Sequence, residues 1–326
     1  MTTRRPALGV LMVILSAVLF AVNGTVSKLV LRAGVEAAQL TLIRAAGAFV
    51  GLLALSLLLR PGARRLRITP GQLPLLIGYG LTGFFLVPML YFVAISRMPV
   101  GIALLFEYTA PLLVALWAWF GEHQRVRPRL WGGLALSLVG LACVAEAWGD
   151  LKLDGFGVLA GLGAAVLLAG YYVLGARGVR ERDSLSLTTW AFGASAVAGL
   201  LTRALTDGTG GWEPLRESSG GVPVLLLCGY VVVLGSIVPF LLVAGALRHL
   251  PATSVGILGM VEPVVAAAVA WITLGAGEAL NVAQLGGGLL VLAGVALAET
   301  ARIAEPTVTP AVPASAPASD VVAAPH

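Results

Sequence analysis

The chain has 326 residues, of which 58% are hydrophobic and only 11% charged, and its mean hydropathy is +0.95. A single water-soluble core cannot hide so much apolar surface, so the composition excludes a soluble protein and predicts an all-α integral membrane protein. The net charge of +5 and the isoelectric point near 9.6 do not call for nucleic acid as a partner, because loops that flank membrane helices carry such basic residues.

Transmembrane helices are expected wherever about 20 apolar residues can cross a hydrocarbon core about 30 Å thick. We predict ten of them, at 8–30, 37–59, 72–95, 98–120, 128–147, 155–176, 184–203, 222–246, 250–275 and 279–299. The first is not a secretory signal peptide, because it is long for one and no clear cleavage site follows it. Residues 1–7 form a short cytoplasmic N-terminus, and the residues 301–326, rich in Pro, Ala and Ser, form a disordered cytoplasmic tail.

Basic residues alternate between the two sides of the predicted helices. If the N-terminus is cytoplasmic, that side holds fourteen Arg and Lys residues and the opposite side six, while Arg44 lies within the second span. The positive-inside rule therefore places both termini in the cytoplasm and predicts an even number of spans. We expect a multi-pass protein of the cytoplasmic membrane, with the lipid bilayer as its surroundings.

An internal repeat divides the chain into two copies of one unit, predicted at 8–147 and 155–299. Corresponding residues keep a nearly constant spacing: Pro88 and Pro239 are 151 residues apart, and Gly140 and Gly294 are 154 apart. The stretch 16–21 also resembles 164–169, at an offset of 148. Five helices in each copy give two five-helix repeats. Such repeats are typical of secondary transporters, which bind their substrate where the halves meet.

Several motifs recur in the same order in both copies. These are the helix starts Glu107-Tyr108-Thr109-Ala110-Pro111 and Glu262-Pro263, the helix endings 117–122 and 271–278, and a Gly-rich final helix. On these motifs the chain resembles the EamA family of the drug/metabolite transporter superfamily, over nearly its whole length. The resemblance implies inverted repeats, because an odd number of helices per half inverts the second copy, and transport of small metabolites by alternating access.

Two carboxylates fall deep within predicted spans, where an ionised group costs roughly 2.5 to 3.5 kcal/mol unless it faces a cavity or a partner. Glu107 lies four residues before Pro111, which frees the carbonyl of Glu107. Glu262 directly precedes Pro263, so the two acids are not equivalent in the repeat. Helical geometry still allows both to face one central groove. Each is a candidate for binding an ammonium group or taking up a proton, or else is a packed structural Glu.

Arg44 is the one basic residue that we place well inside the membrane, in the second span. It can pair with an acid, hold a substrate carboxylate, or extend to the interface with no further role. Its expected counterpart in the seventh span is Ala191, so the site need not be symmetric. Asn23 in the first span is a further candidate, because an amide at membrane depth requires partners.

Aromatic residues and prolines complete the candidate site. A pocket for apolar or aromatic parts of a substrate is predicted from Tyr91, Tyr108, Tyr171 and Trp190. Prolines within spans are expected to act as hinges, because each removes a backbone hydrogen bond. These are Pro88 and Pro239, which free the carbonyls of Phe84 and Gly235, and Pro111 and Pro263. The abundant glycines are expected to permit close helix packing.

The sequence favours a secondary transporter of small organic metabolites. The first hypothesis is an exporter of amino acids or related compounds. It contains no Walker A motif, so transport is expected to use an ion gradient or the substrate's own gradient. No catalytic residue, metal site or cofactor is predicted, and a functional monomer is expected. The alternatives are a flippase for lipids or polyprenyl carriers and, further off, a membrane-embedded lipid-modifying enzyme or a channel.

Overall fold

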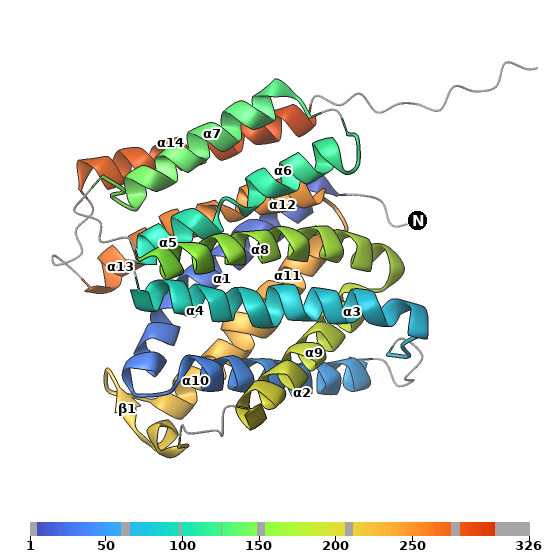
Figure 1. Cartoon of the computed structure of the whole chain (residues 1–326), viewed down its shortest axis with the longest axis vertical. Coiled ribbons are helices and arrows are strands. Elements are labelled where there is room, and N and C mark those ends of the chain that lie inside the picture. Colours follow the sequence, from blue (N-terminus) through green and yellow to red (C-terminus); the bar gives the residue numbers. More distant parts are fainter. Residues whose placement is uncertain are drawn as a thin grey trace, which may run out of the picture.

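The computed structural model describes residues 5–59, 66–97, 100–124, 126–148, 154–205, 211–274 and 281–303. These residues fold into a bundle of packed helices (Figure 1), which confirms the predicted all-α class. One small addition was not predicted: Ser218–Ser219 (β1) and Val222–Pro223 (β2) pair as an antiparallel hairpin. The predicted tail beyond residue 303 and the first four residues lie outside the described part of the chain.

In the first part of the chain, up to residue 148, some predicted spans are single α-helices and others consist of several shorter helices. Its elements are α1 (Pro6–Arg32), α2 (Ala37–Leu59), the 3-10 helix η2 (Pro70–Gln72), α3 (Leu73–Tyr79), the π-helix η3 (Gly80–Leu86), α4 (Val87–Arg97), α5 (Val100–Glu107), α6 (Ala110–Phe120) and α7 (Pro128–Val144).

The second part repeats this order, with the hairpin inserted before α10. Its elements are α8 (Gly155–Glu181), α9 (Ser184–Leu205), the 3-10 helix η4 (Glu213–Arg216), β1, β2, α10 (Val224–Val232), the π-helix η5 (Val233–Ile237), α11 (Val238–Ala246), α12 (Ala252–Gly259), α13 (Val261–Leu274) and α14 (Val282–Ile303).

Eight helical segments of the described chain are long and apolar enough to cross a membrane by length and composition: Pro6–Arg32, Ala37–Leu58, Pro70–Ala94, Ile102–Phe120, Gly155–Glu181, Ser184–Leu205, Val224–Ala246 and Val282–Ala301. They overlap eight of the ten predicted spans. The other two predicted spans, 128–147 and 250–275, contain the shorter apolar helices Pro128–Val144 and Ala252–Ala266. The chain is a multi-pass membrane protein, and a total of ten spans stays a prediction.

Four predicted spans are interrupted, and each interruption lies next to a predicted hinge proline. The π-helices η3 and η5 directly precede α4 and α11, whose second residues are Pro88 and Pro239. Helices α5 and α6 are separated by Tyr108 and Thr109, just before Pro111, and Pro263 lies at the start of α13. A proline cannot donate a backbone hydrogen bond, so the first turn of a new helix is the place where it is tolerated.

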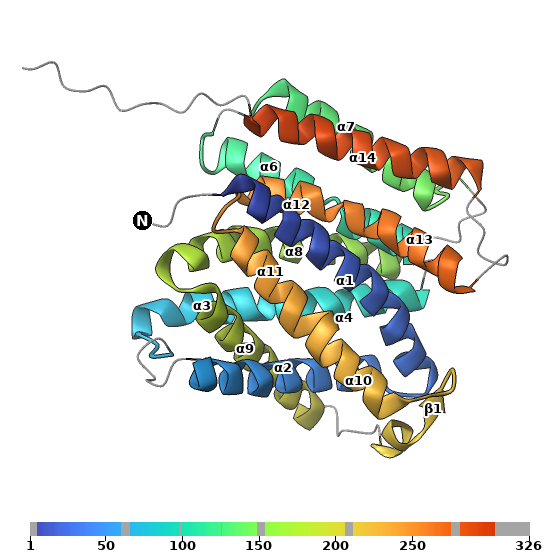
Figure 2. The same ribbon diagram turned by 180° about the vertical axis from the view of Figure 1, so that it is seen from behind.

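The two halves are interlocked, because the first helix of each half packs within the other half. Helix α1 lies against α10, α11 and α13, and α8 lies against α4, α5 and α6 (Figures 1 and 2). Tyr171 of α8 presses on Gly83 of η3, and Asn23 of α1 presses on Gly235 of η5, each so closely that a Cβ on the glycine would overlap the side chain. Tyr171 and Asn23 are 148 residues apart, the offset that the predicted duplication assigns to these helices.

Helices α7 and α14 form a tight pair along one edge of the bundle (Figures 1 and 2). A Cβ added to Gly140 would come within 2.6 Å of the carbonyl oxygen of Gly287, and one added to Gly133 within 2.5 Å of that of Gly294. The buried Ser137 also donates a hydrogen bond of 3.3 Å to the carbonyl of Val291. Small residues thus let the two backbones touch, as predicted for the Gly-rich final helices.

This contact gives a stability test with a matched control on the same helix pair. Gly140→Ala should lower stability by about 1–3 kcal/mol, because the added methyl group meets backbone atoms that cannot rotate away. Gly286→Ala should be neutral or slightly stabilising, because nothing lies within 4 Å of its added Cβ and Ala favours a helix. Thermal unfolding of the detergent-solubilised protein checks both, and equal effects of the two substitutions would contradict the proposed backbone contact.

The contact between Asn23 and η5 can be tested with one substitution that creates a steric clash and a second that removes it. Gly235→Ala should destabilise the protein, because the added methyl group displaces the Asn23 amide. Combining it with Asn23→Ala should restore much of the loss, since the smaller side chain vacates that space. Gly229→Ala on α10 is the control, with nothing within 4 Å of its Cβ. Additive effects of Gly235→Ala and Asn23→Ala on the melting temperature would show that the two sites do not interact.

Candidate functional site

A cavity of about 430 Å³ lies between the two halves and is the centre of the candidate site. Its walls come from α1, η3, α4, α5 and α7 of the first half and from α8, α11, α12 and α13 of the second, with Arg44 reaching in from α2. It extends as far as Leu31 at the end of α1 and Ala145, the residue that follows α7. A cavity of this size suits a small organic molecule.

The cavity does not reach the start of α1, because its first lining residue in that helix is Val13. There Gly9 packs so tightly that an added Cβ would lie 2.7 Å from Leu250 Cγ, in the connection between α11 and α12. Further along α1 the packing is loose, because a Cβ on the cavity-lining Gly24 would meet nothing within 4 Å. The cavity therefore extends from the middle of the bundle toward the side where α1 ends.

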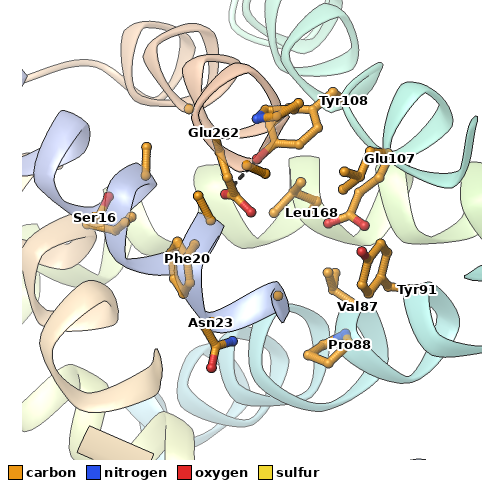
Figure 3. A pocket seen from close by; sticks show the side chains of 18 of the residues that line it. Ser16, Phe20, Asn23, Val87, Pro88, Tyr91, Glu107, Tyr108, Leu168 and Glu262 are labelled. Atoms are coloured by element: carbon orange, nitrogen blue, oxygen red, sulfur yellow. Dashed lines mark hydrogen bonds between the residues drawn. The ribbon is translucent and has the colours of Figure 1, made fainter. Parts of the chain in front are cut away.

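Both predicted acids lie at this cavity (Figure 3), although their positions in the repeat differ. Glu107 is the last residue of α5 and Glu262 is the second residue of α13, so each stands beside a helix break. The adjacent helices α6 and α12 pack against each other, which brings the two breaks to the same depth of the bundle. The structure thus brings together two carboxylates that the sequence places 155 residues apart.

Glu262 has one hydrogen-bond donor and a favourable position in its helix. The hydroxyl of Tyr108 donates a hydrogen bond of 2.6 Å to its Oε2 (Figure 3). The side chain also lies in the first turn of α13, where the partial positive charge of a helix N-terminus favours a carboxylate. Hydrogen bonds to an ionised group are about twice as strong as those between neutral groups. A negative charge at Glu262 is therefore less unfavourable than one at a buried site that lacks these two features.

Glu107 has the opposite surroundings. It ends α5, where the partial negative charge of the helix C-terminus disfavours an anion. Its Oε2 is enclosed and, among the described residues, receives no hydrogen bond. Tyr91 of α4 points toward it across the cavity (Figure 3). An enclosed carboxylate oxygen without a donor is costly, so Glu107 is the acid that needs a proton or a bound cation.

Arg44 is buried, with 9% of its surface exposed, and lines the cavity. Its Nη2 donates a hydrogen bond of 2.8 Å to the carbonyl of Phe84, which also accepts one of 3.0 Å from Ser195 Oγ. This is the carbonyl that Pro88 was predicted to free. Within the described ranges no carboxylate pairs with Arg44, so the ion-pair interpretation of this residue is not supported there. Its guanidinium lies 5.8 Å from the ring centre of Phe240.

Asn23 also lines the cavity, on the face of α1 that presses on Gly235. We expected its amide to find partners, but in the described part of the chain its Oδ1 is enclosed without one. The side chain is held by the shape of the η5 kink rather than by a hydrogen bond to that oxygen. Asn23 is therefore a packing element at the edge of the cavity.

Three of the four predicted aromatic residues line the cavity: Tyr91, Tyr108 and Tyr171. The fourth, Trp190, does not line this cavity. Helix α9 packs against α2 and η3, so its Trp190 lies beside Phe49, with ring centres 6.2 Å apart, and donates a hydrogen bond of 3.0 Å to the carbonyl of Leu66. Of the four prolines, Pro88 and Pro263 line the cavity, and Pro111 and Pro239 are buried beside it.

Helix α1 contributes a continuous wall of which only Asn23 was predicted. Its lining residues Val13, Ser16, Phe20, Asn23, Ser27 and Leu31 recur every three or four residues, which is the spacing of one helix face. Ala17, Ala21, Gly24 and Thr25 of α1 also line the cavity. The signal was present in the sequence as Ser16, Asn23 and Ser27, which place polar groups on one side of an otherwise apolar helix. Within the described chain no three His, Cys, Asp or Glu side chains gather as a metal site.

Comparison with known proteins points to one family. The model of the EamA-like transporter family matches two segments, residues 7–145 and 155–300, which overlap the two predicted copies. An uncharacterized transporter of Archaeoglobus fulgidus is 30% identical over 88% of this chain and 94% of its own length. A crystal structure that is 21% identical superposes with a TM-score of 0.74 and covers 93% of this chain and all of that one, which shows a shared fold.

Two relatives with assigned transport activities match part of the chain. The threonine/homoserine exporter RhtA of Escherichia coli strain K12 is 31% identical over 68% of this chain and 69% of its own length. An S-adenosylmethionine/S-adenosylhomocysteine transporter of Chlamydia trachomatis is 26% identical over 63% of this chain and 64% of its own. Because the family model covers nearly the whole chain, this multi-pass membrane protein belongs to the EamA-like transporter family.

Proposed function

We propose that the protein is a secondary transporter that exports small organic metabolites across the cytoplasmic membrane by alternating access. Amino acids or related compounds are the proposed substrates. The observation that carries the proposal is the cavity between the two halves, which contains two carboxylates and one buried guanidinium. A site at the interface of two repeats, beside interrupted helices, is the arrangement in which transporters bind substrate near the middle of the bilayer.

The relatives support amino acids as the substrate class. Threonine, homoserine, S-adenosylmethionine and S-adenosylhomocysteine, named for two relatives, each carry an ammonium and a carboxylate group on one carbon atom. The cavity offers groups of both signs, Glu107 and Glu262 on one hand and Arg44 on the other. Tyr171, Phe20 and Leu168 supply apolar surface for the rest of a substrate.

The position of the cavity fits the outward-facing state of an alternating-access transporter. With both termini in the cytoplasm, as the distribution of basic residues predicts, the tightly packed region beside Gly9 lies on the cytoplasmic side. The end of the cavity near Leu31 then lies on the outward side. The predicted hinges at the four helix breaks would let the halves rock and expose the same cavity to the cytoplasm. One chain encloses the cavity, so we propose a functional monomer.

Transport by purified protein in proteoliposomes is the direct test. We expect saturable uptake of L-threonine, L-homoserine or another amino acid from a mixed metabolite panel, measured by mass spectrometry with and without an imposed pH gradient. Liposomes without protein are the control. If no soluble metabolite moves while a labelled lipid equilibrates between the leaflets, the metabolite proposal fails and a flippase takes its place.

Proton coupling through the cavity acids is a separate expectation. Replacing both Glu107 and Glu262 by Ala should lower pH-driven transport about tenfold or more, because it removes both carboxylates from the cavity. Glu122→Ala, at an exposed position outside the cavity, is the control for loss of an acid. If the double variant still accumulates substrate in response to a pH gradient, the carboxylates do not couple transport to protons.

A further inference from the structure

We infer that Arg44 and Glu107 form the two ends of a subsite for one zwitterion, with its carboxylate on Arg44 and its ammonium group on Glu107. Glu262 is a positioning residue that Tyr108 holds in place. The inference rests on the proposed function and assigns the charged groups of the cavity to separate tasks. Its basis is that no carboxylate pairs with Arg44 in the described chain and that Glu107 Oε2 receives no hydrogen bond there, whereas Glu262 accepts one from Tyr108.

The first step concerns the free donors of Arg44. A guanidinium has five N–H donors, and within the described chain that of Arg44 donates to a single carbonyl, that of Phe84. A buried cation without a carboxylate partner is costly, and the side chain borders the cavity. Its remaining donors suit a carboxylate, which guanidinium groups bind through two parallel hydrogen bonds. The bond to Phe84 fixes the group before any substrate arrives.

The second step concerns the free acceptor of Glu107. Its position at the C-terminus of α5 and its enclosed Oε2 without a donor both favour a nearby cation. The ionisable groups that interact with it are Glu262 of α13, Tyr91 of α4, Tyr108 just after α5 and Tyr172 of α8, all of them on the cavity. None of these is a cation, so an ammonium group from a substrate supplies what the protein lacks there.

The third step separates Glu262 from Glu107. Glu262 already accepts the Tyr108 hydrogen bond of 2.6 Å and lies at a helix N-terminus. It gains less from a substrate cation than Glu107 does. Its bond to Tyr108, the residue that follows Glu107, links α13 to the break after α5. Loss of Glu262 should therefore disturb the shape of the subsite and weaken all ligands alike.

The test compares whole substrates with analogues that lack one charged group. We would measure binding of L-threonine and L-homoserine to the full-length protein in detergent, beside their amides, which lack the carboxylate, and their N-acetyl derivatives, which lack the ammonium group. Each charged contact should contribute about tenfold or more in affinity. Wild-type protein should therefore prefer the parent amino acid to either analogue by at least that factor.

Conservative variants then assign the contacts. Arg44→Gln should abolish the preference over the amide but keep the preference over the N-acetyl compound, and Glu107→Gln should do the reverse. Glu262→Gln and Tyr108→Phe should weaken the parent and both analogues by similar factors and leave the ratios unchanged. Arg97→Gln, which removes an exposed ion pair with Asp154, and Glu122→Gln are charge-matched controls that should change nothing. Thermal unfolding of each variant verifies that it is folded.

The outcomes are distinct. Suppose that wild-type protein prefers the parent amino acid to both analogues. If Arg44→Gln and Glu107→Gln both keep these two affinity preferences, the assignment is overturned while the proposed function stands. The same holds if Glu262→Gln is the variant that loses one of the preferences. If wild-type protein binds none of the amino acids, the proposed substrate class fails and the inference with it. Loss of one ratio in each of the two variants, with both controls unchanged, supports the zwitterion subsite.

Discussion

A helix inside a bilayer must satisfy its backbone polar groups from within the protein, because lipid offers no hydrogen bonds. This protein departs from that condition where prolines interrupt its helices, and the polar groups of the site gather at these places. The clearest case is the carbonyl of Phe84, which lies four residues before Pro88 and accepts hydrogen bonds from Arg44 and Ser195. One proline thus creates the acceptor that holds a buried guanidinium at the cavity.

The interruptions also explain how the two halves fit together. Each π-helix carries a glycine, Gly83 in η3 and Gly235 in η5, and a side chain from the other half's first helix fills the space beside it. Tyr171 and Asn23 occupy these places at the offset of the predicted repeat. The interlocking places α1 and α8 between the halves, so both helices line the cavity. At the edge of the bundle, glycines serve the simpler purpose of bringing α7 and α14 into backbone contact.

The two carboxylates show how a small difference in sequence becomes a difference in chemistry. Glu107 stands four residues before its proline and Glu262 stands directly before its own. As a result Glu107 ends a helix and Glu262 begins one. The helix dipole therefore opposes a charge at the first and favours it at the second, and Tyr108 adds its hydrogen bond to the second. A near-symmetric repeat thereby contains an asymmetric site.

The sequence by itself determined the properties that depend on local composition. Hydropathy identified the eight long apolar helices of the described chain, the lack of an N–H on proline located all four breaks, and the cost of burying charge singled out Glu107, Glu262 and Arg44 as candidates. Only the tertiary structure decided which way each helix faces. It turned Trp190 away from the cavity, brought the polar face of α1 to it, and paired Arg44 with a carbonyl instead of an acid. The physical reason is that all sides of an apolar membrane helix have similar hydropathy, so its orientation follows from packing against neighbours that are distant in sequence.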